Sequence, residues 1–272
     1  MTMSARTRLD ALLVRRGLTP TPAKAQAAIL AGEVYVNGVR ADKAGMPVDE
    51  DAAVEFRSSR PAFASRGGLK LDHALRAFGT AVAGLTVLDV GASTGGFTDC
   101  LLQRGASRVH AVDVGTGQLD WRLRNDPRVR SLERTDIRDV SPDDLGGPVD
   151  LAVVDVSFIS LKQVLPAVQR LLTPGGSAVV LVKPQFEAAR KHLKRGVVRD
   201  AAVHGDVLER LIATAQAGGW SVVRATPSPL PGPEGNLEFF LLLKNVPGES
   251  APIDVEAVVA RSHDTVLGVP RA

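Results

Sequence analysis

From residue 85 onward, short apolar runs alternate with longer segments in which apolar residues recur at helical spacing. The short runs, bounded by Gly, Pro and polar residues, predict buried strands, and the longer segments predict amphipathic helices. Strands that alternate with helices along a chain form a parallel, doubly wound sheet. The predicted strands cover residues 85–89, 107–113, 129–132, 151–155, 177–182, 221–226 and 237–243, and the predicted helices cover 69–78, 94–103, 119–125, 161–172 and 202–216.

The last predicted strand, 237–243, has a different kind of connection. It follows a loop rich in Pro and Gly, 227–235, rather than a helix. A parallel neighbour needs a long crossover, whereas a loop is enough for a strand that turns back. We therefore expect an α/β fold with a Rossmann-like sheet whose last strand is antiparallel. A C-terminal tail, 247–272, is expected to carry a helix near 254–266.

The beginning of the chain has a separate pattern. Apolar residues recur at helical spacing twice before residue 32, and Thr21 followed by Pro22 is typical of a helix start. The sequence Val34-Tyr35-Val36-Asn37-Gly38-Val39 predicts two strands joined by a tight turn, and residues 54–56 predict a short last strand. We expect a small α+β domain at 1–59, a linker rich in Ser, Arg, Pro and Gly at 60–68, and a second domain at 69–246.

The charge of the N-terminal segment is more informative about a binding partner than the net charge of the whole chain. The protein has a net charge of +3 and a pI of about 9.2, which is weak support for a polyanionic partner. Residues 1–32, however, carry five basic side chains against Asp10 alone, and we expect these to lie on the two predicted helices. Such a run is usually a solvated face, and the alternative is contact with nucleic-acid phosphates. The five residues are Arg6, Arg8, Arg15, Arg16 and Lys24.

Cysteine usage and apolar run lengths bear on the compartment. Cys100 is the only cysteine, so no disulfide forms within the chain and a reducing compartment is expected. We expect Cys100 to pack in the core. The first residues lack the apolar core of a secretion signal, and no run reaches the roughly 18 apolar residues of a spanning helix. These features predict a cytoplasmic protein with no membrane segment.

A glycine-rich loop follows the first strand of the predicted sheet. It has neither the G-x-G-x-x-G pattern of dinucleotide enzymes nor the Lys-Ser/Thr of a P-loop, so it favours a nucleoside ligand without phosphates. Asp113 and Asp136 follow the next two strands, where acids meet ribose hydroxyls and an adenine edge, although either could instead cap a helix or be solvated. S-adenosylmethionine is the ligand that best fits this spacing. The predicted cofactor-binding residues are Asp89, Gly91, Ala92, Ser93, Thr94, Gly95, Gly96, Phe97, Asp113, Val114, Asp136, Ile137 and Asp155.

Further ionisable residues lie at the ends of predicted strands. Asp155 and Lys183 follow apolar runs at the carboxyl edge of the sheet, and Glu238 enters the antiparallel strand at the same edge. Lys70 lies near the start of the predicted helix 69–78, where it is either a solvated lysine or a functional group. We expect Lys70, Asp155, Lys183 and Glu238 to converge.

Several motifs together carry a family resemblance. They are Ser65-Arg66-Gly67-Gly68-Leu69-Lys70-Leu71, Asp89-Val-Gly-Ala-Ser-Thr-Gly-Gly-Phe-Thr, Asp113-Val-Gly-Thr-Gly-Gln-Leu, Val154-Asp155-Val-Ser-Phe-Ile-Ser-Leu, Val182-Lys183-Pro-Gln-Phe-Glu187 and Gly235-Asn-Leu-Glu238-Phe-Phe. Over nearly the whole chain, this set resembles the TlyA family, with an FtsJ-like catalytic domain of the class I methyltransferase type. The resemblance implies S-adenosylmethionine-dependent 2′-O-methylation of cytidine in ribosomal RNA. It also implies that Lys70, Asp155, Lys183 and Glu238 are the catalytic tetrad.

The N-terminal segment carries a second resemblance. Leu13-Val14-Arg15-Arg16-Gly17-Leu18, an Ala-rich stretch and Gly32-Glu33-Val34-Tyr35-Val36-Asn37-Gly38 resemble the small RNA-binding domain named after ribosomal small-subunit protein four. Such domains set cationic side chains against phosphates. The implied partner is ribosomal RNA within ribosomal subunits, bound by a monomer without a metal ion.

The chain departs from the TlyA pattern in two places. Phe63-Ala64 stands where related linkers carry Trp or Tyr. The segment after Lys183, glycine-rich in relatives, here has six Lys or Arg among residues 183–199 against Glu187 alone. We expect it to contact RNA phosphates. The predicted RNA-binding residues beyond the N-terminal five are Arg66, Arg190, Lys191, Lys194 and Arg195.

Alternatives remain for the mechanism and the function. Lys183 either accepts the proton of the ribose hydroxyl, for which it must be neutral, or stays charged and orients the hydroxyl. Asp155 and Glu238 are expected to orient the lysines. The rival functions are a catalytically silent RNA-binding or assembly factor, a membrane-active haemolysin, and a methyltransferase for a small molecule. Family members modify the large subunit alone or both subunits, and the N-terminus and tail of this chain favour both.

Overall fold

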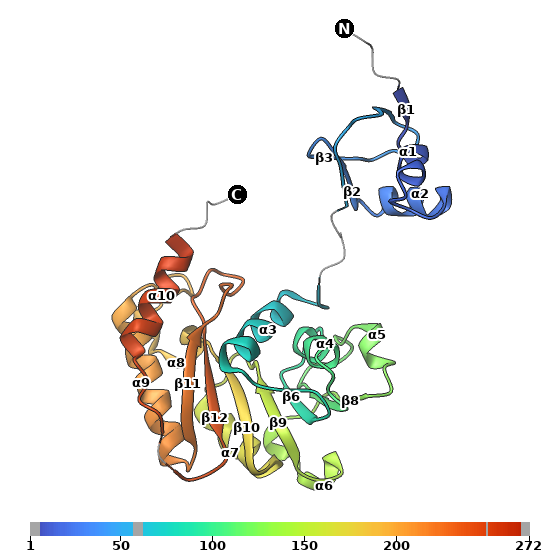
Figure 1. The fold of residues 1–272 in the computed structure, drawn as a ribbon. Coiled ribbons are helices and arrows are strands. Elements are labelled where there is room, and N and C mark those ends of the chain that lie inside the picture. Colours follow the sequence, from blue (N-terminus) through green and yellow to red (C-terminus); the bar gives the residue numbers. More distant parts are fainter. Residues whose placement is uncertain (1–5, 57–61, 249, 268–272) are drawn as a thin grey trace. The chain divides into compact units, whose positions relative to one another are not determined.

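A computed structural model describes residues 6–56, 62–248 and 250–267 of the chain. The chain divides into two compact units, Met1–Pro61 and Ala62–Ala272, which are described separately (Figure 1). Residues 60–61 of the predicted linker and residues 268–272 of the predicted tail lie outside the described residues. The domain limits at residues 59, 68 and 246 stay predictions.

The first unit is a small α+β fold. The two predicted helices are α1 (Leu9–Arg15) and α2 (Pro22–Leu30), and the side chain of Thr21 accepts the Lys24 N–H at the start of α2. Strand β2 (Val34–Val36) pairs antiparallel with β3 (Val39–Arg40) and β5 (Val54–Phe56), which confirms the predicted turn and last strand. The core is apolar: Leu9, Leu12, Leu13, Ala25 and Ile29 are almost completely buried.

One short ribbon of this unit was not predicted. Strand β1 (Arg6–Arg8) pairs antiparallel with β4 (Pro47–Asp49). Arg6 and Arg8 therefore lie on a strand, and the expectation that they lie on a helix is wrong. A strand of three residues is too short to show alternation, and its partner lies about forty residues away along the chain, so sequence pattern gives no signal for it.

The second unit contains a seven-stranded sheet in the order β11-β12-β10-β9-β6-β7-β8. The strands are β6 (Thr86–Val90), β7 (Arg108–Val112), β8 (Val129–Leu132), β9 (Val149–Val154), β10 (Leu172–Val182), β11 (Ser221–Pro227) and β12 (Phe239–Lys244). β12 lies antiparallel between β10 and β11, as predicted, and the other strands are parallel. The register opposes Val182 and Phe239, so Lys183 and Glu238, the residues just beyond this pair, reach the same edge.

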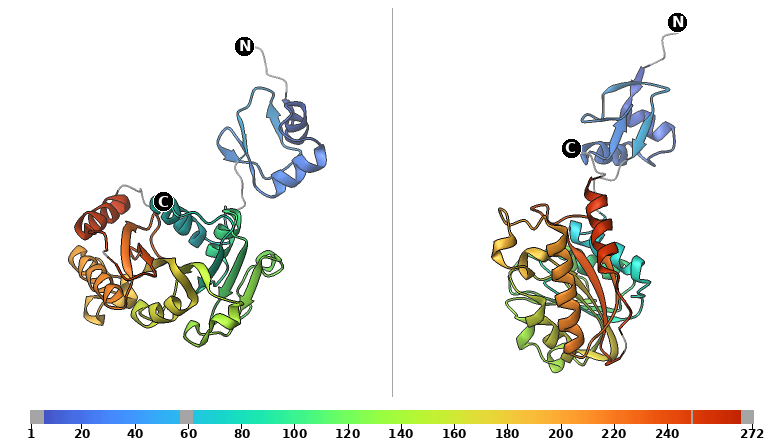
Figure 2. Two further views of the ribbon diagram at one scale, coloured as in Figure 1. Left: turned by 60° about the horizontal axis from the view of Figure 1, so that its bottom comes forward. Right: turned by 90° about the vertical axis from the view of Figure 1, so that its left-hand side faces the viewer.

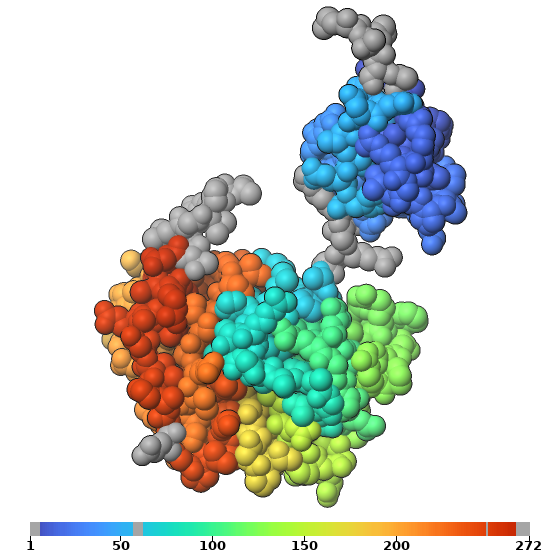
Figure 3. All heavy atoms as spheres, in the orientation of Figure 1, coloured from blue at the N-terminus to red at the C-terminus, as the bar shows by residue number. Residues whose placement is uncertain are grey.

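Helices cover both faces of the sheet (Figures 1 and 2). The longer ones are α3 (Arg66–Phe78), α4 (Gly96–Gln103), α7 (Leu161–Leu171), α9 (Ala201–Ala217) and α10 (Val255–Leu267). In the space-filling view, α3 in cyan and α10 in red form part of the molecular surface (Figure 3). The helix predicted over 119–125 is present but shorter, as α5 (Trp121–Arg124). Four further one-turn elements were not predicted, because they are too short to show periodicity: α6 (Pro142–Leu145), α8 (Pro184–Glu187), η1 (Ile137–Asp139) and η2 (Arg190–His192).

Helix α3 begins earlier than its sequence suggests. Gly67 and Gly68 read as linker residues, yet the helix starts at Arg66 with Ser65 as its cap. A Cβ at Gly68 would lie 2.3 Å from the Phe63 side chain, so glycine is required there for Phe63 to pack against the helix. Lys70 consequently lies in the second turn of α3 rather than at its start.

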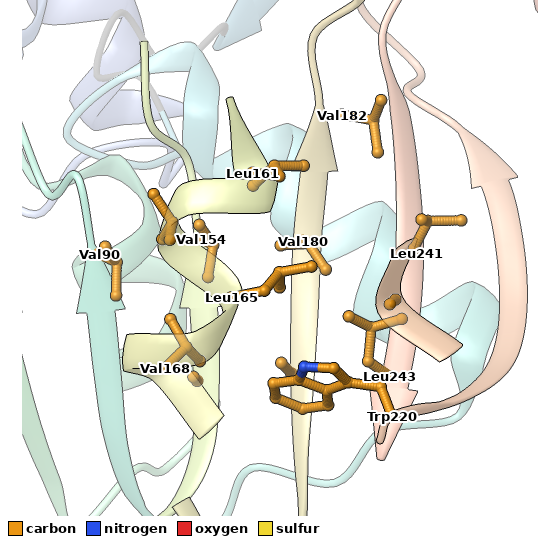
Figure 4. Packing of buried hydrophobic residues seen from close by; sticks show 14 of the residues in the cluster. Val90, Val154, Leu161, Leu165, Val168, Val180, Val182, Trp220, Leu241 and Leu243 are labelled. Atoms are coloured by element: carbon orange, nitrogen blue, oxygen red, sulfur yellow. The ribbon is translucent and has the colours of Figure 1, made fainter. Parts of the chain in front are cut away.

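The sheet separates two apolar cores, because alternate residues of each strand point to opposite faces. One core joins Val90, Val154 and Val180 to Leu165 of α7 and to Trp220 (Figure 4). The other core packs α3 and α4 on the opposite face. Cys100 is completely buried there, as expected, and burial raises the pKa of its thiol to about 12.

Candidate functional site

A cavity of about 250 Å³ lies at the carboxyl edge of the sheet, beside the glycine-rich loop. Lys70, Asp155, Lys183 and Glu238 all line it. We call it the lysine cavity. Its remaining walls are Ser65, Arg66, Gly67, Gly91, Ala92, Ser93, Thr94, Gly96, Phe97 and Pro233.

Four different elements bring the ionisable residues to this cavity. Lys70 comes from α3, Asp155 follows β9, Lys183 follows β10, and Glu238 immediately precedes β12. Parallel strands end at one edge of a sheet, which brings Asp155 and Lys183 together. Glu238 reaches the same edge only because β12 runs the opposite way.

The first lysine–carboxylate pair is buried. Nζ of Lys70 lies 2.6 Å from Oε2 of Glu238, and their side chains are 9% and 1% exposed. Gly232 makes this possible, since a Cβ there would lie 2.6 Å from the other oxygen of Glu238. A solvated Lys70 is therefore excluded, and the lysine is part of the cavity wall.

The second pair is more accessible. Nζ of Lys183 lies 2.5 Å from Oδ1 of Asp155, with side chains 13% and 24% exposed. The same nitrogen donates a hydrogen bond of 2.9 Å to Oγ of Ser157. Sequence reasoning missed Ser157, although its position two residues after Asp155 in the same loop could have indicated it.

A second, more apolar cavity of about 350 Å³ adjoins the first and shares Gly91, Ser93 and Asp155 with it. We call it the apolar cavity. Its polar groups include Asp113, Asp136 and Gln118. Its apolar wall consists of Val90, Val112, Val114, Ile137, Val156, Phe158, Ile159 and Val164.

The glycine-rich loop is held closely against the strand beside it. Gly91 has φ 85°, and a Cβ there would lie 2.4 Å from the carbonyl oxygen of Asp155. Asp113 accepts the backbone N–H groups of Ser93 at 2.8 Å and Gly115 at 2.7 Å. Asp113 thus fixes the loop, and a carboxylate has lone pairs left for a ligand.

Two predicted cofactor-binding residues line neither cavity: Gly95, at the cap of α4, and Asp89. Asp89 is completely buried, and Thr98 donates a hydrogen bond of 2.6 Å to its Oδ2. Burial, with a smaller effect of the Asp155 charge, raises the pKa of Asp89 to about 7. Its direct contact with a cofactor stays a prediction.

Asp136 lines the apolar cavity, but its carboxylate is already engaged. The guanidinium of Arg138 binds both carboxylate oxygens, at 3.0 and 2.6 Å, and lowers the pKa of Asp136. The Arg138 N–H also donates to it. The expected contact with an adenine edge would have to use a remaining lone pair or the neighbouring backbone.

The basic residues of the first unit are largely paired within it. Arg6 and Arg15 form ion pairs with Asp49 and Glu50, and Arg8 pairs with Asp10, whose pKa it lowers to about 2. Arg16 donates to two backbone carbonyls of the same unit. Lys24 is exposed on α2. These side chains are at the surface, but much of their charge is locally compensated.

The basic residues after Lys183 differ from those of the first unit. We call the segment 190–195 the cationic loop. Its four predicted RNA-binding side chains are exposed, and within the described ranges none has a hydrogen bond or ion pair: Arg190, Lys191, Lys194 and Arg195. Asn236 holds the base of the loop, since it accepts the Val198 N–H and donates to the Gly196 carbonyl. Arg66 is exposed and lines the lysine cavity.

An exposed aromatic side chain also escaped the sequence analysis. Phe158 is 90% exposed, has φ 65°, and lies with its ring centroid 4.9 Å from that of Phe186. Phe158 follows Ser157 and Phe186 follows Lys183, so the two rings stand beside the accessible lysine pair. Aromatic faces of this kind are suited to stacking with a base.

The described ranges 6–56, 62–248 and 250–267 contain no group of His, Cys, Asp and Glu side chains arranged to hold a metal ion. Within them, no helix has both the length and the apolar character required to cross a bilayer.

Comparison with known proteins gives matches to both units. Residues 63–245 match the FtsJ-like methyltransferase family, and residues 7–54 match the S4 domain. A Mycobacterium tuberculosis protein named 16S/23S rRNA (cytidine-2′-O)-methyltransferase TlyA is 48% identical over 244 residues, which are 89% of this chain and 91% of that protein. The Bacillus subtilis protein YqxC, named provisionally as an rRNA methyltransferase, is 46% identical over 97% of this chain and 96% of its own length. A solved Streptococcus thermophilus structure, described provisionally as a haemolysin, has a TM-score of 0.75 and 42% identity, and the match covers 98% of each chain.

Proposed function

The chain belongs to the TlyA family of FtsJ-like methyltransferases, and from this premise we propose that it methylates the ribose 2′-hydroxyl of a cytidine in ribosomal RNA with S-adenosylmethionine. One observation carries the proposal: both lysine–carboxylate pairs line the cavity that the glycine-rich loop borders. Two acid–base pairs beside a nucleoside-type loop fit a reaction that must deprotonate or orient a hydroxyl group. The name of the M. tuberculosis relative supports cytidine and both ribosomal subunits as the substrate.

The residues present fit the cofactor. The apolar cavity offers a slot for an adenine ring, and Asp113 at its border can accept hydrogen bonds from ribose hydroxyls. The tight approach of Gly91 to the Asp155 carbonyl leaves the loop backbone free of side chains where the two cavities meet. S-adenosylmethionine supplies an electrophilic methyl group on a sulfonium. The remaining chemistry, alignment and proton removal, belongs to the protein.

Lys183 is the group best placed to act on the substrate hydroxyl. Its Nζ contacts Asp155 and Ser157, and a tetrahedral nitrogen has room for one more partner. A charged Lys183 would donate its remaining N–H to the ribose oxygen and orient it, whereas a neutral one would accept the hydroxyl proton. Asp155 and Ser157 hold the nitrogen in place in both cases.

Lys70 and Glu238 have a different role. Their ion pair is almost completely buried in the wall of the same cavity. A fixed, desolvated pair contributes an oriented electric field without rearranging during the reaction. We propose that this pair sets the electrostatic potential in the cavity and does not itself transfer a proton.

RNA binding combines the S4 domain with groups near the lysine cavity. Arg66 and the cationic loop supply phosphate contacts, and Phe158 supplies a stacking face for the base of the target nucleotide. Since ribosomal subunits are the proposed substrate, we place the enzyme in the cytoplasm. We further propose that it acts as a monomer.

The test uses the full-length protein, labelled S-adenosylmethionine, and ribosomal subunits from cells that lack the modification. We expect label in the RNA, located by ribose-methylation mapping at cytidine, with Lys183→Ala as the inactive control. Label in ribosomal protein, or on a base instead of a ribose, would contradict the proposal. Equal labelling by the wild type and by Lys183→Ala would show that the methylation comes from a contaminant.

A further inference from the structure

One exposed aromatic residue near the lysine cavity has no role in the function proposed above. Trp121, the first residue of α5, is 75% exposed, whereas the second tryptophan of the chain, Trp220, is buried in the core. Single exposed apolar residues are common and need no explanation. Trp121 is different because its place in the fold is fixed relative to the cavity.

Two contacts attach Trp121 to the wall of the lysine cavity. The backbone N–H of Asp120, its neighbour in sequence, donates to the carbonyl oxygen of Thr94 at 3.2 Å, and Thr94 lines the cavity. Leu119 and Leu123, two residues before and after Trp121, fill the space over Gly95. Leu119 precedes the helix, whereas Leu123 lies two positions after Trp121 within α5, and residues two positions apart in a helix point to nearly opposite sides. The indole is therefore held outward, at the rim, by leucines anchored on the glycine-rich loop.

Arginine side chains surround this position. Arg122 is the next residue; its side chain is 67% exposed and pairs with Asp120, and Arg124 lies on the same helical turn. Arg124 pairs with Glu133, which places exposed Arg134 next to α5 as well. Asp120 and Glu133 compensate two of these three guanidinium groups, so the patch keeps an excess of one positive charge, at Arg134. Segment α5 stands out at the surface of its unit in bright green (Figure 3).

An indole face beside guanidinium groups is the combination that binds unpaired nucleic-acid bases. Aromatic side chains stack on bases whatever the sequence, and Arg adds cation–π and phosphate contacts. An RNA whose target ribose enters the lysine cavity must pass its flanking nucleotides over the rim. The cationic loop follows Lys183, and Trp121 stands on the side of the glycine-rich loop.

We propose that Trp121, with Arg122 and Arg134, forms a stacking surface for an unpaired RNA base that flanks the methylated nucleotide. The proposal rests on the proposed function for the identity of the RNA. It assigns substrate binding, and no chemical step, to this surface.

Fluorescence tests the contact directly, because Trp121 is the exposed one of only two tryptophans. The difference in emission between the wild type and Trp121→Phe isolates the signal of Trp121. We expect acrylamide to quench this signal in the free full-length protein. A short, cytidine-containing, single-stranded RNA should lower the emission and protect it from acrylamide.

Kinetics with ribosomal subunits test the role. Stacking on an aromatic face is worth roughly a 5- to 140-fold change in affinity per base. We expect Trp121→Ala to raise KM for the subunits about tenfold within that range. Its kcat and its affinity for S-adenosylmethionine, measured by calorimetry, should stay unchanged. Trp121→Phe should retain most of the binding, and Trp121→Leu, apolar but without a flat face, should behave like Trp121→Ala.

Five results would overturn the proposal. They are an unchanged emission at saturating RNA, a Leu variant as good as the Phe variant, a loss of cofactor affinity in Trp121→Ala, shielding of Trp121 in the free protein, and an emission change with ribosomal subunits but not with protein-free ribosomal RNA. The fourth would indicate that another part of the chain or a second copy covers the indole, and the fifth a ribosomal protein. If the wild type methylates no RNA but the oligonucleotide protects Trp121, the stacking surface stands and the proposed function fails.

Discussion

The two lysine–carboxylate pairs of the lysine cavity contain the same chemical groups in different surroundings. Lys70 and Glu238 are 9% and 1% exposed, and they come from positions 168 residues apart. Lys183 and Asp155 are 13% and 24% exposed, and Ser157 is a further partner of the lysine. One pair is enclosed by the fold, and the other stands where a substrate can reach it.

This difference separates structural from catalytic consequences. Removing one partner of a buried pair leaves an uncompensated charge in the interior, which costs stability. A more accessible pair costs less to break, because water reaches the partner that is left. The buried pair should therefore reveal itself in unfolding experiments, and the accessible pair in turnover.

The largest expected effect is on turnover in Lys183→Ala. We expect methyl transfer to slow by about 10²–10⁴-fold, the usual contribution of a positioned acid–base group. Binding of S-adenosylmethionine, measured by calorimetry, should persist, because Lys183 does not line the apolar cavity. Lys183→Arg sharpens the result: arginine stays charged, so activity in this variant would favour orientation over proton transfer. Wild-type turnover in Lys183→Ala would remove this lysine from the mechanism.

The next effect is on stability, and it directly contrasts the pairs. Glu238→Gln should lower the free energy of unfolding of the methyltransferase unit by about 3–5 kcal/mol, and Asp155→Asn by about 1 kcal/mol. Urea unfolding followed by tryptophan emission measures this unit alone, since both Trp121 and Trp220 belong to it. The double variant Lys70→Met/Glu238→Leu is the matched control, which should recover stability without recovering activity. Equal losses of unfolding free energy in Glu238→Gln and Asp155→Asn would show that the two pairs do not differ in their contribution to stability.

A third effect concerns the affinity for RNA. The cationic loop follows Lys183 of the accessible pair, and no such loop follows Lys70 of the buried pair. Neutralising Arg190, Lys191, Lys194 and Arg195 to Gln should weaken RNA binding and reduce the slope of log affinity against log salt by up to about 3. The stability of the unit should hardly change, since these side chains are exposed. Arg108→Gln/Lys244→Gln, at the opposite edge of the sheet, serves as the control for removed charge. An unchanged salt slope in the fourfold variant would exclude the loop from phosphate contact.

A fourth effect concerns a third carboxylate, Asp89, whose pKa is raised to about 7 by burial and, to a lesser extent, by the charge of Asp155. For a raised pKa, the stabilisation of the protonated form is fully present below the unfolded-state value near 3.8 and is lost as the pH rises toward about 7. Unfolding measured from pH 4 to pH 8 should show this loss in the wild type but not in Asp89→Asn. In Asp155→Asn the loss should be slightly smaller. Parallel pH curves for the wild type and Asp89→Asn would show that Asp89 does not titrate in this window.

Much of the fold follows from local pattern. Strand runs and amphipathic helices predicted the sheet, and the loop at 227–235 predicted the antiparallel β12. The predictions that were wrong concern elements that are short or whose limits depend on packing. The start of α3 was hidden because Gly67 and Gly68 are typical of linkers, whereas both lie within the helix and Gly68 leaves room for Phe63. The helical placement of Arg6 and Arg8 failed because the pairing of β1 with β4 is non-local.

The candidate site likewise contains residues that the sequence predicted and residues that it did not. The order of residues along the chain was sufficient to place Asp155 and Lys183 at strand ends, and the structure brings all four predicted ionisable residues to one cavity. Ser157 and the exposed Phe158 and Trp121 were not identified, because the first two lie in a loop and Trp121 in a one-turn helix, where no periodic pattern indicates exposure or side-chain direction. The formal charge of the N-terminal segment was visible in sequence, but its compensation by Asp10, Asp49 and Glu50 was not.

The sequence by itself determined that this chain has a doubly wound sheet, a glycine-rich loop and ionisable residues at its carboxyl edge, because these features depend on residues near one another along the chain. Only the tertiary structure decided which lysine is buried and which is accessible. Lys70 meets Glu238 through the register of Val182 opposite Phe239 and the packing of α3 against the sheet. These contacts join distant segments, and their effect on a charge depends on how much water the completed fold excludes.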